Sequence, residues 1–228
     1  VRVLDTLPRR VSALDLVKGK IPRLLHMFWL SSETMPSRTV RHLAEWRRLM
    51  PTWTFKLWLL GDEDEFGPDV KAKIGAAVTP LQRADILRGW VLRKYGGVAL
   101  NERVVPLNSL EPIVQMGQDL VLCHWRVVNC TYIQCDLVAA APGQPVLDRL
   151  CSILQAADLN TYDTEMTTGA YAMGLAVETC APPPATHYCI LPANALYRDD
   201  PAAFGNVVLF DTTGITLNQA IRAQLCAE

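Results

Sequence analysis

The sequence predicts a three-layer α/β domain with a mostly parallel sheet. Short apolar segments of strand character alternate along the chain with longer segments whose apolar residues recur at a helical period. Three of the four predicted helical segments begin near a proline, and the clearest of them ends at a glycine pair. No internal repeat or linker divides the 228 residues, a length that fits one domain, so residues 1–228 are expected to form a single unit.

The first part of the chain predicts a strand, a helix and a second strand. Arg23–Leu30 is short, apolar and rich in aromatic residues, as a buried strand would be. Pro36 permits a helix start and Pro51 ends the helix. Its predicted apolar stripe consists of Val40, Leu43, Trp46, Leu49 and Met50. Thr54–Leu60 is the second predicted strand, and an acidic loop, Gly61–Gly67, follows it.

The segment Pro80–Tyr95 gives the clearest helical pattern. Gly96 and Gly97 end it, because glycine accepts the left-handed conformation that often closes a helix. Val98–Leu100 is then expected to be a third strand. A broad apolar face suited to packing on a sheet is formed by Leu81, Ala84, Ile86, Leu87, Trp90, Val91 and Leu92.

The second part of the chain continues the alternation. Asp119–Trp125 and Asp136–Ala141 are predicted strands, and Pro145–Ala157 and Gly169–Cys180 are predicted helices. His187–Leu191 is a late strand. In open, mostly parallel sheets ligands bind beyond the carboxyl ends of the strands. The loops after Trp29 and at residues 101–103 are therefore expected at the mouth of a site.

Composition and charge exclude several classes of protein. The formal net charge is −1 with no basic stripe, which argues against nucleic acid as a partner. No apolar run reaches the roughly 18 residues that a membrane span needs, and residues 1–20 contain no signal-peptide core. We expect a cytoplasmic protein without a span in this chain, unless an anchor precedes it.

Cysteine usage favours free thiols in a reducing compartment. There is no C-x-x-C pair among the seven cysteines, and their number is odd. A disulfide between Cys180 and Cys189 is an open alternative. The four histidines have no ligand-like spacing with the cysteines, so no metal site of this type is predicted.

The pair Asp85 and Arg88 lies three residues apart and therefore on one face of the predicted helix. One interpretation is a solvated ion pair of little energetic consequence. The other is a sugar-binding pair, because a carboxylate accepts hydrogen bonds from neighbouring hydroxyls and a guanidinium donates in a fixed fork. Spacing alone leaves both open.

The sequence around this pair, Ala84–Val98, reads A-D-I-L-R-x-x-x-L-x-x-Y-G-G-V. This run resembles the sugar-binding region of family 32 glycosyltransferases, which are related to glucosylating clostridial toxins and initiating α-1,6-mannosyltransferases. Further similar segments, in the same order as in the family, are Ile21–His26 with Trp29, the series Trp46, Pro51, Trp53, Phe55 and Trp58, Ala141–Pro145, and Thr168-Gly169.

The resemblance implies a GT-A fold, the Rossmann-like fold of nucleotide-diphospho-sugar transferases, with a mostly parallel central sheet flanked by helices. It implies transfer of a sugar from a UDP- or GDP-sugar to a glycan or protein acceptor, with retention at the anomeric carbon. Asp85 and Arg88 would bind the donor sugar, and Trp29 would stack near the nucleobase or else be a core aromatic. His26 is expected to be a satisfied strand histidine rather than a catalyst.

The sequence departs from the family at its D-x-D motif, whose carboxylates hold Mn²⁺ or Mg²⁺. That slot, 16 positions after Asp85, contains Asn101-Glu102-Arg103, and Ala99 stands where the family often has tyrosine. A guanidinium has no acceptor atom and cannot ligate a cation. No metal site is therefore predicted, although the family's members use one. Asn101 keeps the ability to bind a ribose or sugar hydroxyl.

Three outcomes of this departure stay open. Arg103 replaces the metal and stabilises the leaving diphosphate, so that catalysis is metal-independent. Alternatively, the chain is a catalytically inactive sugar-nucleotide-binding or scaffold protein. In the third outcome Arg103 is a surface residue at a strand end. Arg103 and Glu102 are the predicted catalytic residues, with Asp136 a further carboxylate near the site.

Overall fold

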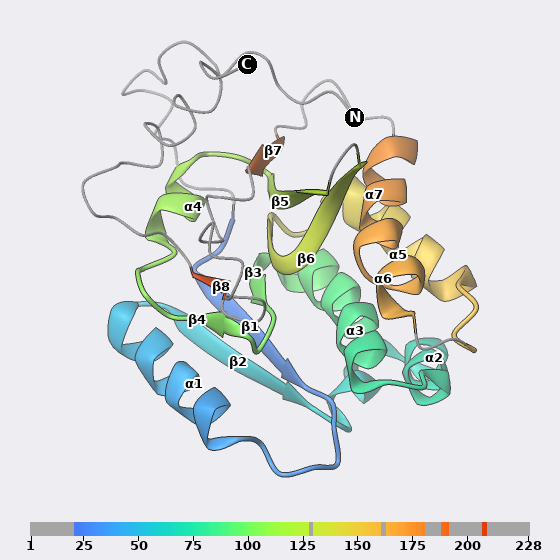
Figure 1. The fold of residues 1–228 in the computed structure, drawn as a ribbon, viewed down its shortest axis with the longest axis horizontal. Helices are drawn as coiled ribbons and strands as arrows, with labels where there is room; N and C mark the ends of the chain where they lie inside the picture. The colour runs from blue at the N-terminus through green and yellow to red at the C-terminus, as the bar shows by residue number, and fades with distance from the viewer. Residues whose placement is uncertain (1–20, 128–129, 161–162, 181–187, 192–206, 209–228) are drawn as a thin grey trace.

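In the computed structural model, the described residues are 21–127, 130–160, 163–180, 188–191 and 207–208, and they contain a six-stranded sheet in the order β2-β1-β3-β6-β5-β7 (Figure 1). The strands are β1 (Leu24–Trp29), β2 (Thr54–Leu59), β3 (Gly97–Leu100), β5 (Leu120–Val127), β6 (Cys130–Ala140) and β7 (Tyr188–Leu191). The pairings make β6 antiparallel to its two neighbours, while the other strands run in one direction. The predicted mostly parallel sheet is confirmed.

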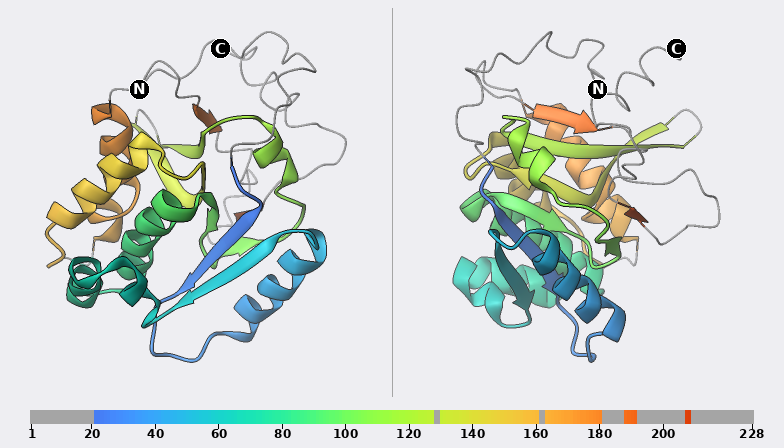
Figure 2. Two further views of the ribbon diagram at one scale, coloured as in Figure 1. Left: turned by 180° about the vertical axis from the view of Figure 1, so that it is seen from behind. Right: turned by 90° about the vertical axis from the view of Figure 1, so that its left-hand side faces the viewer.

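Helices cover both faces of this sheet (Figure 2). The helical elements are α1 (Ser37–Leu49), the 3₁₀ helix η1 (Asp62–Phe66), α2 (Pro68–Ala76), α3 (Pro80–Tyr95), α4 (Glu111–Gln115), α5 (Pro145–Ala156), α6 (Thr164–Thr167) and α7 (Ala170–Thr179). A second, two-stranded sheet pairs β4 (Val104–Val105) in parallel with β8 (Val207–Val208). The strands and helices predicted from periodicity are thus confirmed to within about two residues at their ends, except that β6 begins at Cys130, six residues before the predicted start at Asp136.

Three details of the expected elements differ from the structure. Helix α2 is not predicted by the sequence pattern, because its inward face consists of only two buried apolar residues, Val70 and Ile74, one helical turn apart. The loop after β2 is wound into η1 rather than irregular. In α1, Val40 is not part of the buried stripe, since it is 51% exposed, whereas Thr39 is buried with Trp46.

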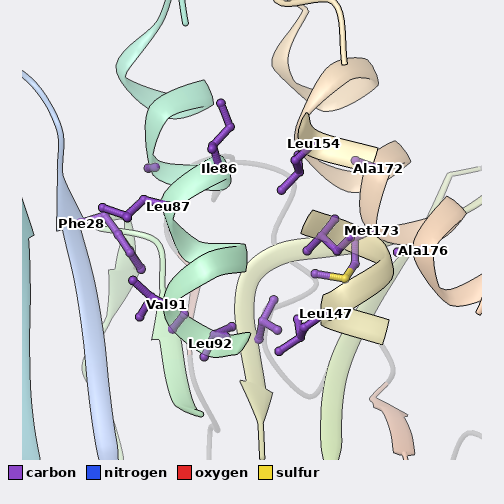
Figure 3. Packing of buried hydrophobic residues seen from close by; sticks show 14 of the residues in the cluster. Phe28, Ile86, Leu87, Val91, Leu92, Leu147, Leu154, Ala172, Met173 and Ala176 are labelled. Carbon is purple, nitrogen blue, oxygen red and sulfur yellow. The ribbon is translucent and has the colours of Figure 1, made fainter. Parts of the chain in front are cut away.

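The larger hydrophobic core lies between the sheet and α3, α5 and α7 (Figure 3). Phe28 of β1 and Ala99 of β3 face Leu87 and Val91 of α3, and further along the sheet α5 and α7 supply Leu147 and Met173. Burying a side chain of this size contributes about 1.5–3 kcal/mol. This core therefore fixes α3, the helix that carries Asp85 and Arg88, against β1 and β3.

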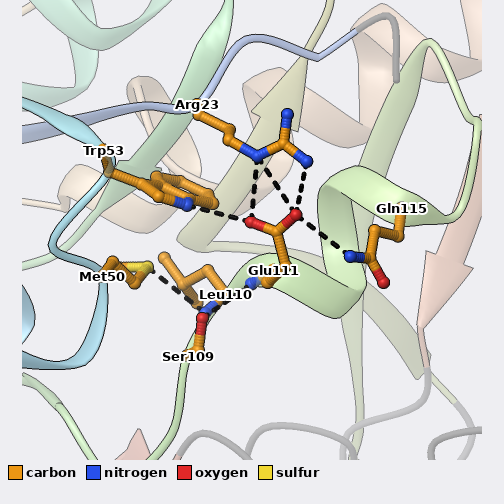
Figure 4. Close-up of polar contacts among 7 residues, drawn as sticks. All are labelled: Arg23, Met50, Trp53, Ser109, Leu110, Glu111 and Gln115. Carbon is orange, nitrogen blue, oxygen red and sulfur yellow. Dashed lines mark hydrogen bonds and ion pairs between the residues drawn. The ribbon is translucent and has the colours of Figure 1, made fainter. Parts of the chain in front are cut away.

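The opposite face of the sheet packs on α1 and α4. Met27 of β1 and Leu100 of β3 contact a second cluster that includes Trp46. A polar network ties α4 to this side, in which Arg23, Trp53 and Gln115 all donate hydrogen bonds to the Glu111 carboxylate (Figure 4). These bonds, chiefly the one from Arg23, lower the pKa of Glu111 to about 2.

Helix α3 has well-defined ends. Thr79 forms a capping box with Gln82 at the amino end, as the Oγ1 of Thr79 accepts from the Gln82 amide at 3.0 Å. At the other end Gly96 and Gly97 have φ of 63° and 97°. A Cβ at Gly97 would lie 2.4 Å from the Leu24 carbonyl oxygen. Only glycine fits this close approach of the helix end to β1.

The cysteines among the described side chains form no disulfide, and Cys123, Cys151 and Cys189 are buried. The alternative of a Cys180–Cys189 disulfide is therefore wrong, because neither residue is in a disulfide. Burial raises the pKa of the Cys189 thiol to about 11. Cys226 lies outside the described residues. Within the described part of the chain, no helix has the length and apolarity to cross a membrane.

Candidate functional site

The predicted site residues converge on one edge of the sheet. β1 and β3 are parallel neighbours, so their carboxyl ends, at Trp29 and Leu100, lie at the same edge. Helix α3 leads directly into β3 and runs in the opposite direction, which brings its amino-terminal half to that edge. Arg83 of α3 donates to the Leu30 carbonyl just beyond β1, at 3.4 Å. This is the position where open α/β sheets bind their ligands.

Asp85 and Arg88 form a buried ion pair within α3. Their residues are 5% and 3% exposed, and the Arg88 Nη1 donates to the Asp85 Oδ1 in a very short contact. The interpretation of this pair as solvated is therefore wrong. Thr168 donates its hydroxyl to the other carboxylate oxygen, Oδ2, at 3.2 Å. The Arg88 guanidinium lies over the Phe28 ring, 5.7 Å from its centroid, a favourable cation–π distance.

Strand β6 brings further polar groups to the same place through an irregularity in its pairing. Val121 of β5 pairs with Ala139, but Cys123 pairs with Gln134, so extra residues of β6, Asp136 among them, lie in a bulge. Burial lowers the pKa of Arg88, but the charge of Asp85, with smaller contributions from Cys135, the Asp85 hydrogen bond and Asp136, outweighs it and raises the pKa. Among the described residues the buried Arg88 Nε has no hydrogen-bond partner.

The segment Asn101-Glu102-Arg103 forms a tight turn at the end of β3. The Asn101 amide donates to the Asp136 carbonyl at 2.9 Å, and the Asn101 carbonyl accepts from Val104 at 3.1 Å. The Asn101 Oδ1 accepts from the Arg103 amide at 3.1 Å, which fixes the turn. The Arg103 side chain is 61% exposed, and its Nε lies 3.8 Å from a Glu102 carboxylate oxygen. The turn therefore presents a guanidinium to solvent at the carboxyl end of β3.

The residues of this turn do not fit the divalent cation that the sequence resemblance implies. Glu102 supplies the one carboxylate of the turn, Arg103 offers no acceptor, and the Asn101 oxygen is already engaged by the backbone. In the part of the chain that the structure describes, no three His, Cys, Asp or Glu side chains gather as metal ligands would.

Trp29 lies apart from the Asp85–Arg88 pair. Side chains alternate along β1, and Met27 faces the α1 side while Phe28 faces α3, so Trp29 lies on the α1 side, away from Asp85 and Arg88. The Trp29 indole donates to the Glu33 carbonyl at 2.9 Å, and the ring is only half-buried. The structure does not join Trp29 to the buried pair, and its stacking role stays a prediction.

His26 is a satisfied structural histidine, as expected. Its Nε2 lies 2.8 Å from the Gly96 carbonyl oxygen, and its Nδ1 accepts from the Trp58 indole at 3.0 Å. The ring is therefore neutral, with the proton on Nε2. Burial lowers the pKa of His26 to about 4.

Two contacts of the buried pair could not be predicted from the chain alone. The alternation of β1 shows that Phe28 and Trp29 face opposite sides, but not which side Arg88 occupies. Thr168-Gly169 belongs to the family-like pattern, yet the spacing gives no sign that the Thr168 hydroxyl binds Asp85, 83 residues earlier. Long-range contacts of this kind depend on tertiary structure.

Comparison with known proteins identifies the fold. No protein-family model and no curated protein matches the sequence. Among solved structures, a chain titled "PaToxG Glycosyltransferase" is similar, with a TM-score of 0.57 and 11% identity over 69% of each chain. The chain therefore has the Rossmann-like fold of a glycosyltransferase. At this identity the likeness establishes the fold alone, and the narrower resemblance to family 32 stays a prediction.

Proposed function

We propose that the chain is a glycosyltransferase that moves a sugar from a UDP- or GDP-sugar to a glycan or protein acceptor with retention. The observation that carries the proposal is the buried Asp85–Arg88 pair at the carboxyl edge of a glycosyltransferase-like sheet. A paired carboxylate and guanidinium offer the acceptors and donors that adjacent sugar hydroxyls require. In this proposal, Asp85, Arg88 and Asn101 bind the donor sugar or ribose, and Trp29 contacts the nucleobase.

Arg103 is the group that stabilises the departing diphosphate in this proposal. Its exposed guanidinium stands at the strand end where a metal-dependent enzyme of this fold would have carboxylates. A guanidinium binds phosphate oxygens in a bidentate manner and stays charged at all physiological pH. In the reaction the bond from the anomeric carbon to the diphosphate oxygen breaks, a bond to the acceptor oxygen forms on the same face, and the acceptor proton passes to the diphosphate.

The test is donor turnover without metal. Purified chain is incubated with a panel of UDP- and GDP-sugars, with Mn²⁺ or with excess EDTA, and nucleoside diphosphate release is measured. We expect turnover to persist in EDTA and to fall at least about 100-fold in Arg103→Ala, the usual effect of removing one charge-stabilising donor. Arg48→Ala is the matched control, since Arg48 is equally exposed but lies on α1. Loss of activity in EDTA with recovery on adding Mn²⁺ would show that a metal does this work.

A second candidate function is a catalytically inactive sugar-nucleotide-binding or scaffold protein. It is favoured by one observation: the Asp85 and Arg88 charges already satisfy each other, and the turn at residues 101–103 lacks an acidic pair. Calorimetric binding of UDP-glucose or GDP-mannose without any turnover would support this candidate. No binding to either nucleotide sugar would leave only a role in protein association.

A further inference from the structure

The Asp85–Arg88 pair is covered, and a donor sugar cannot reach it while the cover stays in place. Its two side chains are 4% and 3% exposed. One flank is closed by Phe28 and the sheet, which belong to the rigid core. On another side Thr168 donates to Asp85. Thr168 follows α6 directly, and residues 163–168 are here called the α6 turn. If the proposed function is correct, some part of this enclosure has to move.

The α6 turn is held to α3 through polar side-chain contacts along one face of the helix. Positions 79, 82 and 85 are three residues apart and so lie above one another. The contacts are Thr79 Oγ1 with Thr164 Oγ1 at 3.3 Å, Gln82 Nε2 to Thr167 Oγ1 at 3.4 Å, and Thr168 Oγ1 to Asp85 Oδ2 at 3.2 Å. Each lies towards the long end of the hydrogen-bond range.

Two of these contacts can be given up without leaving the Thr167 and Thr168 hydroxyls unpaired. The Thr167 Oγ1 donates to the Asp163 carbonyl at 2.8 Å, and the Thr168 Oγ1 also lies 3.5 Å from the Thr164 carbonyl, both within the α6 turn. The turn does not anchor itself with its largest apolar residue either, because Met166 is 52% exposed. The three threonine contacts with α3 are therefore long ones, and Met166 adds no buried apolar anchor to them.

Arg88 also has a buried nitrogen atom, Nε, that the described residues leave without a hydrogen-bond acceptor. The Arg88 Nε is buried and makes no hydrogen bond in the described part of the chain, although Arg88 is only 3% exposed. Buried donors in native proteins are almost always paired. A hydroxyl or phosphate oxygen of a bound molecule would supply the acceptor that the protein does not.

We infer that the α6 turn is a movable cover over the Asp85–Arg88 pair. It opens to admit the donor, and the Thr168 hydroxyl then gives up its place on Asp85 Oδ2 to a hydroxyl of the sugar. This inference rests on the proposed function for the identity of the ligand. The movement itself concerns only this chain and can be tested without a ligand.

A reversible disulfide between the α6 turn and α3 tests the movement. The Oγ1 atoms of Thr79 and Thr164 are 3.3 Å apart, so Thr79→Cys with Thr164→Cys places two sulfurs close enough to bond. Accessibility of Arg88 is measured by the rate of phenylglyoxal modification, resolved by peptide mass spectrometry. The exposed Arg48 serves as an internal reference. The reduced form of the same variant is the matched control, since it carries both substitutions.

We expect the oxidised variant to modify Arg88 at least ten-fold more slowly than the reduced variant, with Arg48 unchanged. UDP-glucose and GDP-mannose should bind the reduced form and not the oxidised form. Equal Arg88 modification in the two forms would overturn the inference. If Arg88 is protected by the disulfide but neither nucleotide sugar binds the reduced or the wild-type protein, the cover exists and the proposed function is what fails.

A substitution that does not depend on disulfide formation gives a second test. Thr168→Val removes the hydroxyl that binds Asp85 and keeps the shape of the side chain, whereas Thr168→Ser keeps the hydroxyl. Losing one hydrogen bond to a charged group should raise the Arg88 modification rate about ten-fold in Thr168→Val. Thr168→Ser should modify at the wild-type rate. Identical rates in the two variants would mean that Thr168 does not hold the cover closed.

Discussion

Two buried polar clusters lie on the α3 face of the sheet, and they differ in how completely they are satisfied. The His26 cluster (His26, Trp58 and Gly96) has a partner for both imidazole nitrogens. The Asp85 cluster (Asp85, Arg88 and Thr168) is a charged pair in which one buried guanidinium nitrogen, the Arg88 Nε, has no partner in the part of the chain that the structure describes. The first lies where α3 ends and the second in the half of α3 nearest the predicted site.

The difference fits a structural role for the His26 cluster and the ligand-binding role that we propose for the Asp85 cluster. A cluster that is neutral and fully paired stabilises the packing and has nothing left to offer a ligand. A buried ion pair contributes little net stability, because desolvation offsets the attraction, and an unpaired donor beside it adds a cost. These features fit the ligand-binding role that we propose for the Asp85 cluster. This contrast makes different predictions for the two clusters.

The largest expected effect is on the Asp85 cluster. Asp85→Ala leaves the Arg88 charge buried without its partner, which should lower the free energy of unfolding by about 3–5 kcal/mol. The measurement is urea denaturation of the purified variant at neutral pH. The double variant Asp85→Leu with Arg88→Met removes both charges and should unfold at a free energy close to that of the wild type, because it needs no charge desolvation.

Donor binding by the same two variants tests whether the Asp85 cluster differs in role from the His26 cluster. Neither should bind UDP-glucose or GDP-mannose by calorimetry, although the double variant is stably folded. Separation of stability from binding is what a functional pair predicts. If the double variant were as unstable as Asp85→Ala, the pair would be a structural element like the His26 cluster.

The sequence predicts the fold better than the site. The strands around Met27 and Ala99 and the helix containing Leu87 have strong local periodicity, and the structure confirms them. The pairing of Asp85 with Arg88 is also predictable, because it depends only on helical spacing. The burial of that pair is not, since it depends on Phe28 from another element and on Thr168, 83 residues away. The bulge at Asp136 likewise arises from strand register, which no local pattern shows.

The His26 cluster should make stability depend on pH. The folded-state pKa of His26 is about 4, below the ordinary value of 6.5, so the unfolded chain binds the proton more readily. Its contribution is fully present above pH 6.5 and is lost as the pH falls towards 4. The expected loss between pH 8 and pH 5 is about 2 kcal/mol. Urea denaturation at several pH values measures it.

The control for this prediction is His26→Gln, which cannot titrate. The pKa of His42 is also lowered, chiefly by partial burial, and gives a slope of the same sign in both proteins. Glu111, whose pKa is about 2, loses its contribution only below pH 4.5, outside the range compared. The wild type should therefore have the steeper dependence between pH 8 and pH 5. Parallel curves would contradict the assignment of a buried neutral histidine.

The smallest effect is expected at Thr79, where the α6 turn meets the amino end of α3. Thr79→Ala removes the helix cap and the contact with Thr164, and should lower the free energy of unfolding by about 1 kcal/mol. Thr79→Ser retains both and should be close to wild type in the same urea measurement. A loss of several kcal/mol in Thr79→Ala would mean that the α6 turn is part of the cooperative core, as the His26 cluster is. The small value is what a weakly held cover requires, because opening has to cost much less than unfolding.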